Sequence, residues 1–332
     1  MVFILLANVT FGQSVNDAYS LGVQGIQKVD EGNYDEGIAL LKKARNLEPQ
    51  DYDYAFEIGK AYMLKQDFQK AEKHLFPLQY HVNAQADLYL LLSTCYGYLE
   101  QMKKAPDPQR KKELDALRYG IQKLPEAGIL YLELAKRNLE LERSVEALAT
   151  LENGIRNAPV FAENYYWAAK LMKASSGHFW AWIYAEACFN MTDDVELQRS
   201  SARIIDLSLK AIAASAWKPE PNKMETDLRF LLDSKCTMPK NSGIEELGLF
   251  RNCLLTEWNV SSYSFSQIFE RLKKLNEKDW LDSYVASQMQ ETDRATFLSW
   301  LAAHPQEFDA YGKWRYWNPM APTQPILRNP NN

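Results

Sequence analysis

The chain has 332 residues, of which 46% are apolar and 24% are charged, a composition that excludes collagen-like, low-complexity and wholly disordered proteins. Its 38 Lys and Arg are outnumbered by 43 Asp and Glu, so the net charge is −5. Because binding to a phosphate backbone needs a basic surface, this charge argues against nucleic acid as the partner.

The first twelve residues are predicted to be a signal peptide. The apolar run at the start is too short to cross a bilayer, and Thr10 and Gly12 stand at the −3 and −1 positions of a cut after Gly12. No Lys or Arg precedes Lys28, so the usual basic start is missing, and the alternative is that this run forms a first core helix. We expect a periplasmic or secreted protein. Further along, no apolar run reaches about 20 residues, so no integral membrane span is predicted.

From about residue 18 to 195, similar residues recur every 34 positions, with units starting near residues 18, 52, 86, 128 and 162. The third unit fits less regularly and contains an insertion of about eight residues around Ala105–Pro108. Large apolar residues recur at positions 4, 11 and 24 of the units. Small residues recur at positions 8, 20 and 27, among them Gly25, Gly37, Ala44, Gly59, Ala71, Ala135, Ala147, Gly154, Ala169 and Ala181.

Such a period predicts two antiparallel helices per unit, which small residues allow to approach closely. The pattern resembles the tetratricopeptide repeat (TPR) family, and the stretch from Gly177 to Arg199 also resembles secreted TPR proteins of Bacteroidota whose role is undefined. The resemblance implies an all-α, right-handed α-solenoid of about five helix pairs. Gly37, where the family has Ala at position 20, and Lys28, where it has Tyr at position 11, depart from the family pattern.

In this family the concave groove is formed mainly by positions 2, 5, 9 and 12 of the first helices. The resemblance therefore implies a groove for a protein or peptide partner. Its candidate residues are Tyr19, Ile26, Phe56, Lys60, Met63, Leu90, Leu132, Lys136, Tyr166, Lys170 and Lys173. The Lys and Asn with which some TPR domains grip a chaperone's C-terminal carboxylate are absent, because Gly22 and Ile26 occupy those positions. The sequence leaves open whether C-terminal helices fill the groove.

After the repeats, residues 195–216 are predicted to form a capping helix, and residues 224–317 a helical extension. Helical patterns cover 224–234, 244–257, 264–275, 278–289 and 293–315, the last interrupted before Pro305. The Pro-rich residues 318–332 are predicted to be extended or disordered. Cys236 and Cys253 flank a loop-like stretch, where a disulfide would contribute about 3 kcal/mol, and the spacing does not decide whether it forms.

No motif of a catalytic, metal-binding or cofactor-binding site occurs in the sequence. His74 and His81, the closest histidine pair, would share a face only if one helix continued past Pro77. The main interpretation is therefore a non-catalytic scaffold of the cell envelope without a cofactor. One alternative is a small-molecule or glycan-binding protein that uses the tryptophan-rich C-terminal region, where Trp258, Trp280, Trp300, Trp314 and Trp317 lie. A hydrolase with a site assembled from unrelated helices is a third.

Overall fold

The computed structural model describes residues 2–102, 109–214, 218–219, 223–239, 243–261 and 263–328, so the predicted insertion at Ala105–Pro108 lies outside the described residues. Within these ranges the regular elements are helices, and the chain is an all-α, TPR-like solenoid as predicted. The chain divides into two compact units, residues 1–134 and 135–332. No helix in the described part of the chain is both long and apolar enough to cross a membrane.

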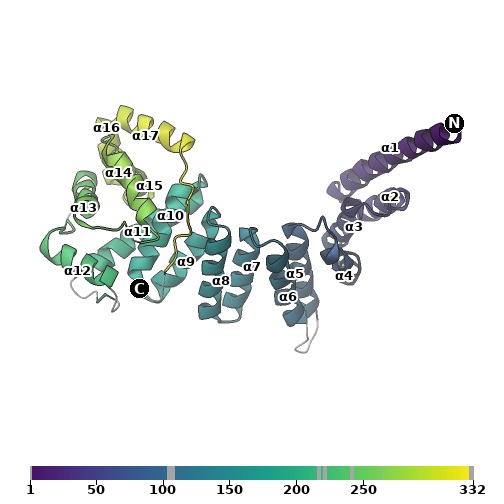
Figure 1. The fold of residues 1–332 in the computed structure, drawn as a ribbon, viewed down its shortest axis with the longest axis horizontal. Coiled ribbons are helices and arrows are strands. Elements are labelled where there is room, and N and C mark those ends of the chain that lie inside the picture. Colours follow the sequence, from purple (N-terminus) through teal and green to yellow (C-terminus); the bar gives the residue numbers. More distant parts are fainter. Residues whose placement is uncertain are drawn as a thin grey trace. The chain divides into compact units, whose positions relative to one another are not determined.

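The first unit consists of helix pairs in chain order (Figure 1). Helix α1 packs against α2, α3 against α4 and α5 against α6, while α2 also contacts α3 and α4 contacts α5. The elements are α1 (Val2–Asp30), α2 (Tyr34–Leu47), α3 (Tyr52–Leu64), α4 (Phe68–Leu75), the 3-10 turn η1 (Phe76–Tyr80), α5 (Ala86–Gln101) and α6 (Gln109–Lys123). Residues 2–12, the predicted signal peptide, are continuous with α1.

The glycines at the repeat positions lie where the helices of a pair touch. A Cβ added to Gly37 would lie 2.7 Å from the Gly25 carbonyl oxygen, and one added to Gly59 would lie 2.4 Å from Leu75 Cδ2. Gly37 therefore departs from the family's Ala because Gly25 faces it across the pair and the backbones are too close for a methyl group. Core side chains such as Leu41 and Ile58 are fully buried beside these contacts.

The turns inside the pairs also repeat with the period of 34. Gly32, Gln66, Glu142 and Ser176 all have positive φ, and 66 − 32 and 176 − 142 both equal 34. In each turn the next amide N–H donates to a carbonyl five residues back, as Asp67 N does to Tyr62 O at 2.9 Å and Gly177 N does to Met172 O at 2.8 Å. This hydrogen bond gives a partner to a carbonyl at the end of the first helix of the pair. The chain therefore reverses direction at the same position in each unit.

Helix α7 (Gly128–Glu140) crosses the boundary between the units, and the second unit continues with three more repeat helices and an extension. In this unit α9 packs against α8, α10 and α11, and α15 packs against α11, α13 and α16. The elements are α8 (Ser144–Asn157), α9 (Ala162–Ala174), α10 (His178–Met191), α11 (Val195–Ala213), α12 (Lys223–Ser234), α13 (Ile244–Glu257), α14 (Ser266–Asn276), α15 (Leu281–Thr292), α16 (Arg294–Ala303) and α17 (Pro305–Trp317). These helices lie where the sequence predicts them, within a few residues.

Helix α10 is the centre of the second unit. Every residue from Phe179 to Asn190 is buried, including the charged Glu186. An α-helix buried on all sides needs neighbours all around it. Here α9 and α11 pack against it, Phe265 and Phe269 meet its aromatic rings edge to face, and Tyr284 of α15 contacts Phe189.

The residues after α17, which the sequence predicts to be extended or disordered, are described as far as residue 328. Residues 320–328 run extended along α10 toward the C-terminus (Figure 1), and Met320, Pro322 and Ile326 are buried. The prolines explain why the segment forms no helix, as predicted. Side chains of α10 and α14 form hydrogen bonds with its backbone, a feature that no pattern in the sequence predicts.

Candidate functional site

The predicted groove residues all lie on the first helices of the pairs, α1, α3, α5, α7 and α9, and we call the surface that these helices present within each unit the A-helix face. Two of them provide no surface. Met63 belongs to the core cluster of the first unit, and Leu132 lies in a run of buried residues in α7. The other nine, Tyr19, Ile26, Phe56, Lys60, Leu90, Lys136, Tyr166, Lys170 and Lys173, are at least partly exposed.

In the first unit the A-helix face is mainly aromatic, and its lysine is paired. Phe56 stacks on Tyr52 with ring centroids 5.7 Å apart, and Lys60 Nζ lies 3.1 Å from Glu57 Oε2. A Cβ added to Gly22 would lie 2.4 Å from the Tyr54 ring, so the position where a carboxylate clamp needs Lys has no room for a side chain. This part of the face therefore offers apolar contact more than charge.

In the second unit the A-helix face carries lysines over aromatic rings. Lys170 Nζ lies 4.1 Å from the centre of the Trp167 ring and 5.9 Å from that of Tyr166. Lys136 Nζ, from α7, lies 5.7 Å from the same Trp167 ring. We call Lys136, Tyr166, Trp167 and Lys170 the Lys–Trp cluster. Trp167 was missed by the sequence reasoning because it falls outside the four groove positions, although the run Tyr165–Trp167 is conspicuously aromatic.

The charge on the A-helix face of α9 changes sign along the helix. Lys170 and Lys173 lie in its second half, whereas Glu163 lies in its first turn. The Glu163 end borders a surface cavity of about 270 Å³, which is also lined by Asp194, Glu196 and Leu197 at the start of α11. A ligand that runs along α9 therefore meets negative charge near the start of the helix and positive charge near its end.

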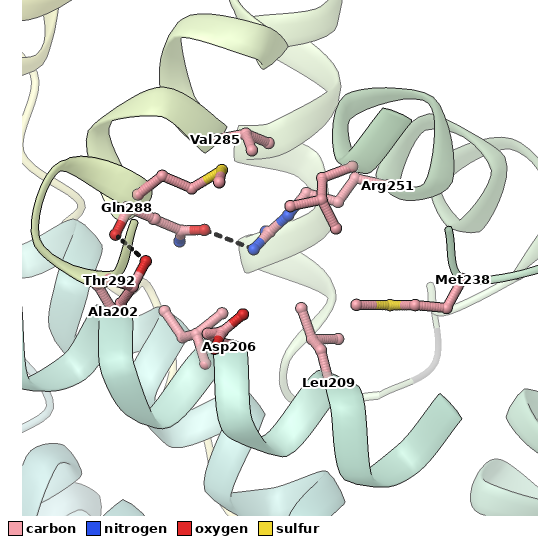
Figure 2. Close-up of a pocket in the computed structure, with 11 residues that line it drawn as sticks. Ala202, Asp206, Leu209, Met238, Arg251, Val285, Gln288 and Thr292 are labelled. Carbon is pink, nitrogen blue, oxygen red and sulfur yellow. Dashed lines mark hydrogen bonds between the residues drawn. The ribbon is translucent and has the colours of Figure 1, made fainter. Parts of the chain in front are cut away.

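A second group of charged residues is buried at the junction of α10 with the C-terminal helices. The Glu186 carboxylate is fully buried and accepts hydrogen bonds from four side chains. Its donors are Arg251 Nη1 at 2.6 Å, Trp182 Nε1 at 3.0 Å, Gln288 Nε2 at 3.2 Å and the Tyr284 hydroxyl. Arg251 also donates to Gln288 Oε1 at 2.5 Å (Figure 2).

The protonation states of this buried network are set by burial and by the charge of Glu186. Burial, and then the Glu186 carboxylate, raise the pKa of the Tyr284 hydroxyl well above 10, so the hydroxyl stays a donor. Burial alone would lower the pKa of Arg251, but the charge of Glu186 raises it. Arg251, Gln288 and Asp206 also line a cavity of about 30 Å³ between α11, α13 and α15 (Figure 2), which has room for about one water molecule. This network is therefore a structural connection between helices.

The tryptophans of the C-terminal region do not share one open surface. Trp258 and Trp300 are buried, and Trp258 packs against Phe179, Phe265 and Phe269. Trp280 and Trp314 are half-buried, with ring centroids 5.9 Å apart. Lys278 lies over Trp280 and Arg271 lies over Trp314.

The described residues contain no group of three or more His, Cys, Asp or Glu side chains that could hold a metal ion. His74 stacks on Tyr62 and His81 packs against Tyr52. Burial, followed by the charges of Arg45 and Lys42, lowers the pKa of His74 to about 4.

Cys236 and Cys253 form a disulfide with Cα atoms 5.6 Å apart, which joins the end of α12 to α13 across 17 residues. Cys95 and Cys188 are free and buried, and burial raises the pKa of both thiols to about 12. A loop of this length predicts a contribution of about 3 kcal/mol to the stability of the second unit.

This disulfide gives a prediction for thiol titration. Denatured without reductant, the protein should show two reactive thiols per chain, and native protein none, because the buried Cys95 and Cys188 lack thiolate. A Cys236→Ala/Cys253→Ala variant should unfold at a lower urea concentration than the wild type, with the same two thiols. Four thiols in unreduced, denatured protein would show that the bridge does not form.

A tetratricopeptide repeat model matches residues 28–96. Among solved structures, a MamA protein (16% identity, TM-score 0.39) covers 63% of this chain and 100% of its own. TTC0263, a TPR protein of Thermus thermophilus (17%, 0.41), covers 57% and 98%, and PilF of Pseudomonas aeruginosa (10%, 0.40) covers 91% and 99%. No curated protein matches the chain.

Proposed function

We propose that this chain, whose residues 28–96 match tetratricopeptide repeats, is a non-catalytic scaffold that binds an extended, acidic peptide segment of a partner protein. TPR folds bind proteins or peptides, and the Lys–Trp cluster is the observation that suggests which kind of peptide. The proposal places the peptide on the A-helix face of α9, across Tyr166 and Trp167.

The chemistry of the Lys–Trp cluster supports an acidic ligand. A Lys ammonium that lies over an indole ring is attracted to the ring electrostatically. Its three N–H groups are not all directed at the ring, so it can still donate hydrogen bonds to a ligand. Lys170 would donate to a carboxylate of the peptide, while the Tyr166 and Trp167 rings would contact an apolar neighbour. Glu163 and Asp194 would repel acidic residues near the start of α9, which sets a direction for the peptide.

A location in the cell envelope or outside the cell is part of this proposal. Two features support it: the apolar start of the chain, and the disulfide between Cys236 and Cys253, since such bonds persist in oxidising compartments. Fractionation of cells that produce the full chain, with N-terminal sequencing of the product, tests it. A product in the cytoplasm that still begins at Met1 would exclude export.

The binding proposal predicts a charge-specific loss of affinity. A Lys170→Glu variant should bind an acidic peptide, selected from a displayed library on the wild type, at least about tenfold more weakly, because it replaces an attractive charge with a repulsive one. The measurement is fluorescence anisotropy of the labelled peptide at two salt concentrations. Lys43→Glu, the same change at an exposed residue of α2, should leave the dissociation constant unchanged. Equal affinity of both variants would refute the proposed site.

The tryptophan-rich region supports a small-molecule or glycan site less well. Sugars bind to open indole faces. Of the five indoles, Trp258 and Trp300 are buried, the faces of Trp280 and Trp314 are approached by Lys278 and Arg271, and Trp317 is the one that is exposed. We therefore place peptide binding first and keep the tryptophan site as the second candidate.

A further inference from the structure

Residues 320–328, which we call the strap, lie in the second unit as a bound extended peptide. Side chains of other elements form hydrogen bonds with its backbone. The Gln267 side chain accepts from Thr323 N at 2.9 Å and donates to Gln324 O at 2.7 Å. The Ser264 hydroxyl donates to Leu327 O at 2.8 Å and accepts from Leu327 N at 3.2 Å.

Both ends of the strap are held as well. At its start, Met320 N donates to the carbonyl of Asn190 at 3.0 Å. At its end, Arg328 N donates to the Tyr184 hydroxyl at 3.1 Å, and Arg328 Nε lies 3.4 Å from Glu152 Oε1. The groups that hold the strap therefore come from α8, α10, and α14 with the residues just before it, and we call them the strap site.

Apolar anchors fix the register of the strap. Met320, Pro322 and Ile326 are buried, whereas Ala321, Thr323 and Gln324 between them are exposed. Ile326 is fully buried, and its backbone lies next to the hydroxyl of the buried Tyr165. Side-chain anchors at intervals, combined with hydrogen bonds to the backbone, are how proteins bind extended peptides in general.

The strap is joined to the helices by a short exposed connection. Asn318 and Pro319 are exposed, and the interactions of Asn318 are with α17. The contacts described above join the strap to the strap site, and none of them involves α17. A strap from a second chain would therefore make the same contacts at the same site, and exchange of terminal segments is a low-cost route to dimers.

We propose that the strap site is a receptor for an extended peptide and that its occupant in trans is the strap of a second copy of this chain. The second copy is the partner that the structure supports, because its sequence is the one that fits these anchors and hydrogen bonds. This surface is separate from the Lys–Trp cluster, and the inference does not depend on the proposed function.

A complementation experiment with full-length chains tests this inference. One chain carries Ile326→Asp, which disables its strap and leaves its strap site intact. The other carries Ser264→Ala and Gln267→Ala, which weaken its site and leave its strap intact. Each chain alone should be monomeric by light scattering at about 100 μM, whereas the mixture should contain a one-to-one dimer. A mixture of monomers only would overturn the inference.

A peptide measurement covers the case in which the dimer is too weak to isolate. A labelled peptide of residues 318–328 should bind the Ile326→Asp chain at least tenfold more tightly than the wild type, whose own strap occupies the site. The same peptide with Ile326→Asp should bind at least tenfold more weakly than the unmodified peptide. Equal binding of the two peptides would overturn the inference. The inference would also be overturned if peptides selected from a library, with sequences unrelated to the strap, displaced the strap peptide. The occupant of the strap site would then be another protein.

Circular dichroism of each variant shows whether it is folded. If Ile326→Asp prevents folding, Ile326→Ala serves in the same two experiments, because it removes most of the anchor without burying a charge. The expected and contradicting results stay the same.

Discussion

Replacement of Glu186 by alanine is expected to lower the free energy of unfolding of the second unit by about 3–5 kcal/mol. The substitution leaves the buried guanidinium of Arg251 without its carboxylate, and it removes the acceptor for Trp182, Tyr284 and Gln288. Urea unfolding followed by tryptophan fluorescence measures the loss, since α10 and its neighbours contain many of the tryptophans.

Single and double substitutions at Glu186 and Arg251 distinguish the contribution of the ion pair to stability from that of side-chain packing. Arg251→Met alone should also be destabilising, because it leaves Glu186 as an unpaired buried charge. Glu186→Leu with Arg251→Met should recover much of the loss, since apolar residues of similar size can replace a buried pair at little cost. A Glu186→Ala protein within about 1 kcal/mol of the wild type would contradict the described network.

Gly37→Ala is expected to destabilise the first unit by about 1–3 kcal/mol, although alanine favours helix formation more than glycine does. The new methyl group would lie 2.7 Å from the Gly25 carbonyl oxygen and 3.0 Å from Val29 N, both of which are backbone atoms. Helices α1 and α2 would have to move apart. Thermal unfolding followed by circular dichroism measures the effect.

Gly312→Ala is the matched control for this prediction. Gly312 lies within α17, and a Cβ added there meets no atom within 4 Å. This substitution should be neutral or stabilise the protein by up to about 1 kcal/mol. If both substitutions had the same effect, close helix contact at Gly37 would not be the reason for the glycine.

The helix pairs could be predicted because their cause is local and periodic. Small residues such as Gly25 and Gly59 recur at fixed positions, and each must admit a neighbouring helix. The positions of the turns followed from the same period. The closeness of Gly25 to Gly37 could not be read from one position, since it depends on both residues together.

The missed features depend on residues far apart in the sequence. Glu186 and Tyr284 are 98 residues apart and Asn190 and Met320 are 130 apart, so no local pattern links them. Glu186 looks in the sequence like an ordinary helix residue, and the strap looks like an extended or disordered tail whose contacts have no local signal. Leu132 was assigned to the groove by its repeat position, but the packing of α7 buries it. In each of these cases, contacts with residues distant in the sequence determine whether the residue is buried.

The central claim, that the partner peptide lies on the A-helix face at the Lys–Trp cluster, is tested most directly by site-specific photo-crosslinking. A photoreactive phenylalanine derivative replaces Tyr166 in one full-length protein and Val145, an exposed residue of α8, in another. With the selected acidic peptide, we expect a crosslinked product from position 166 and none from position 145. Crosslinking from position 145 alone, or equally from both, would contradict the account.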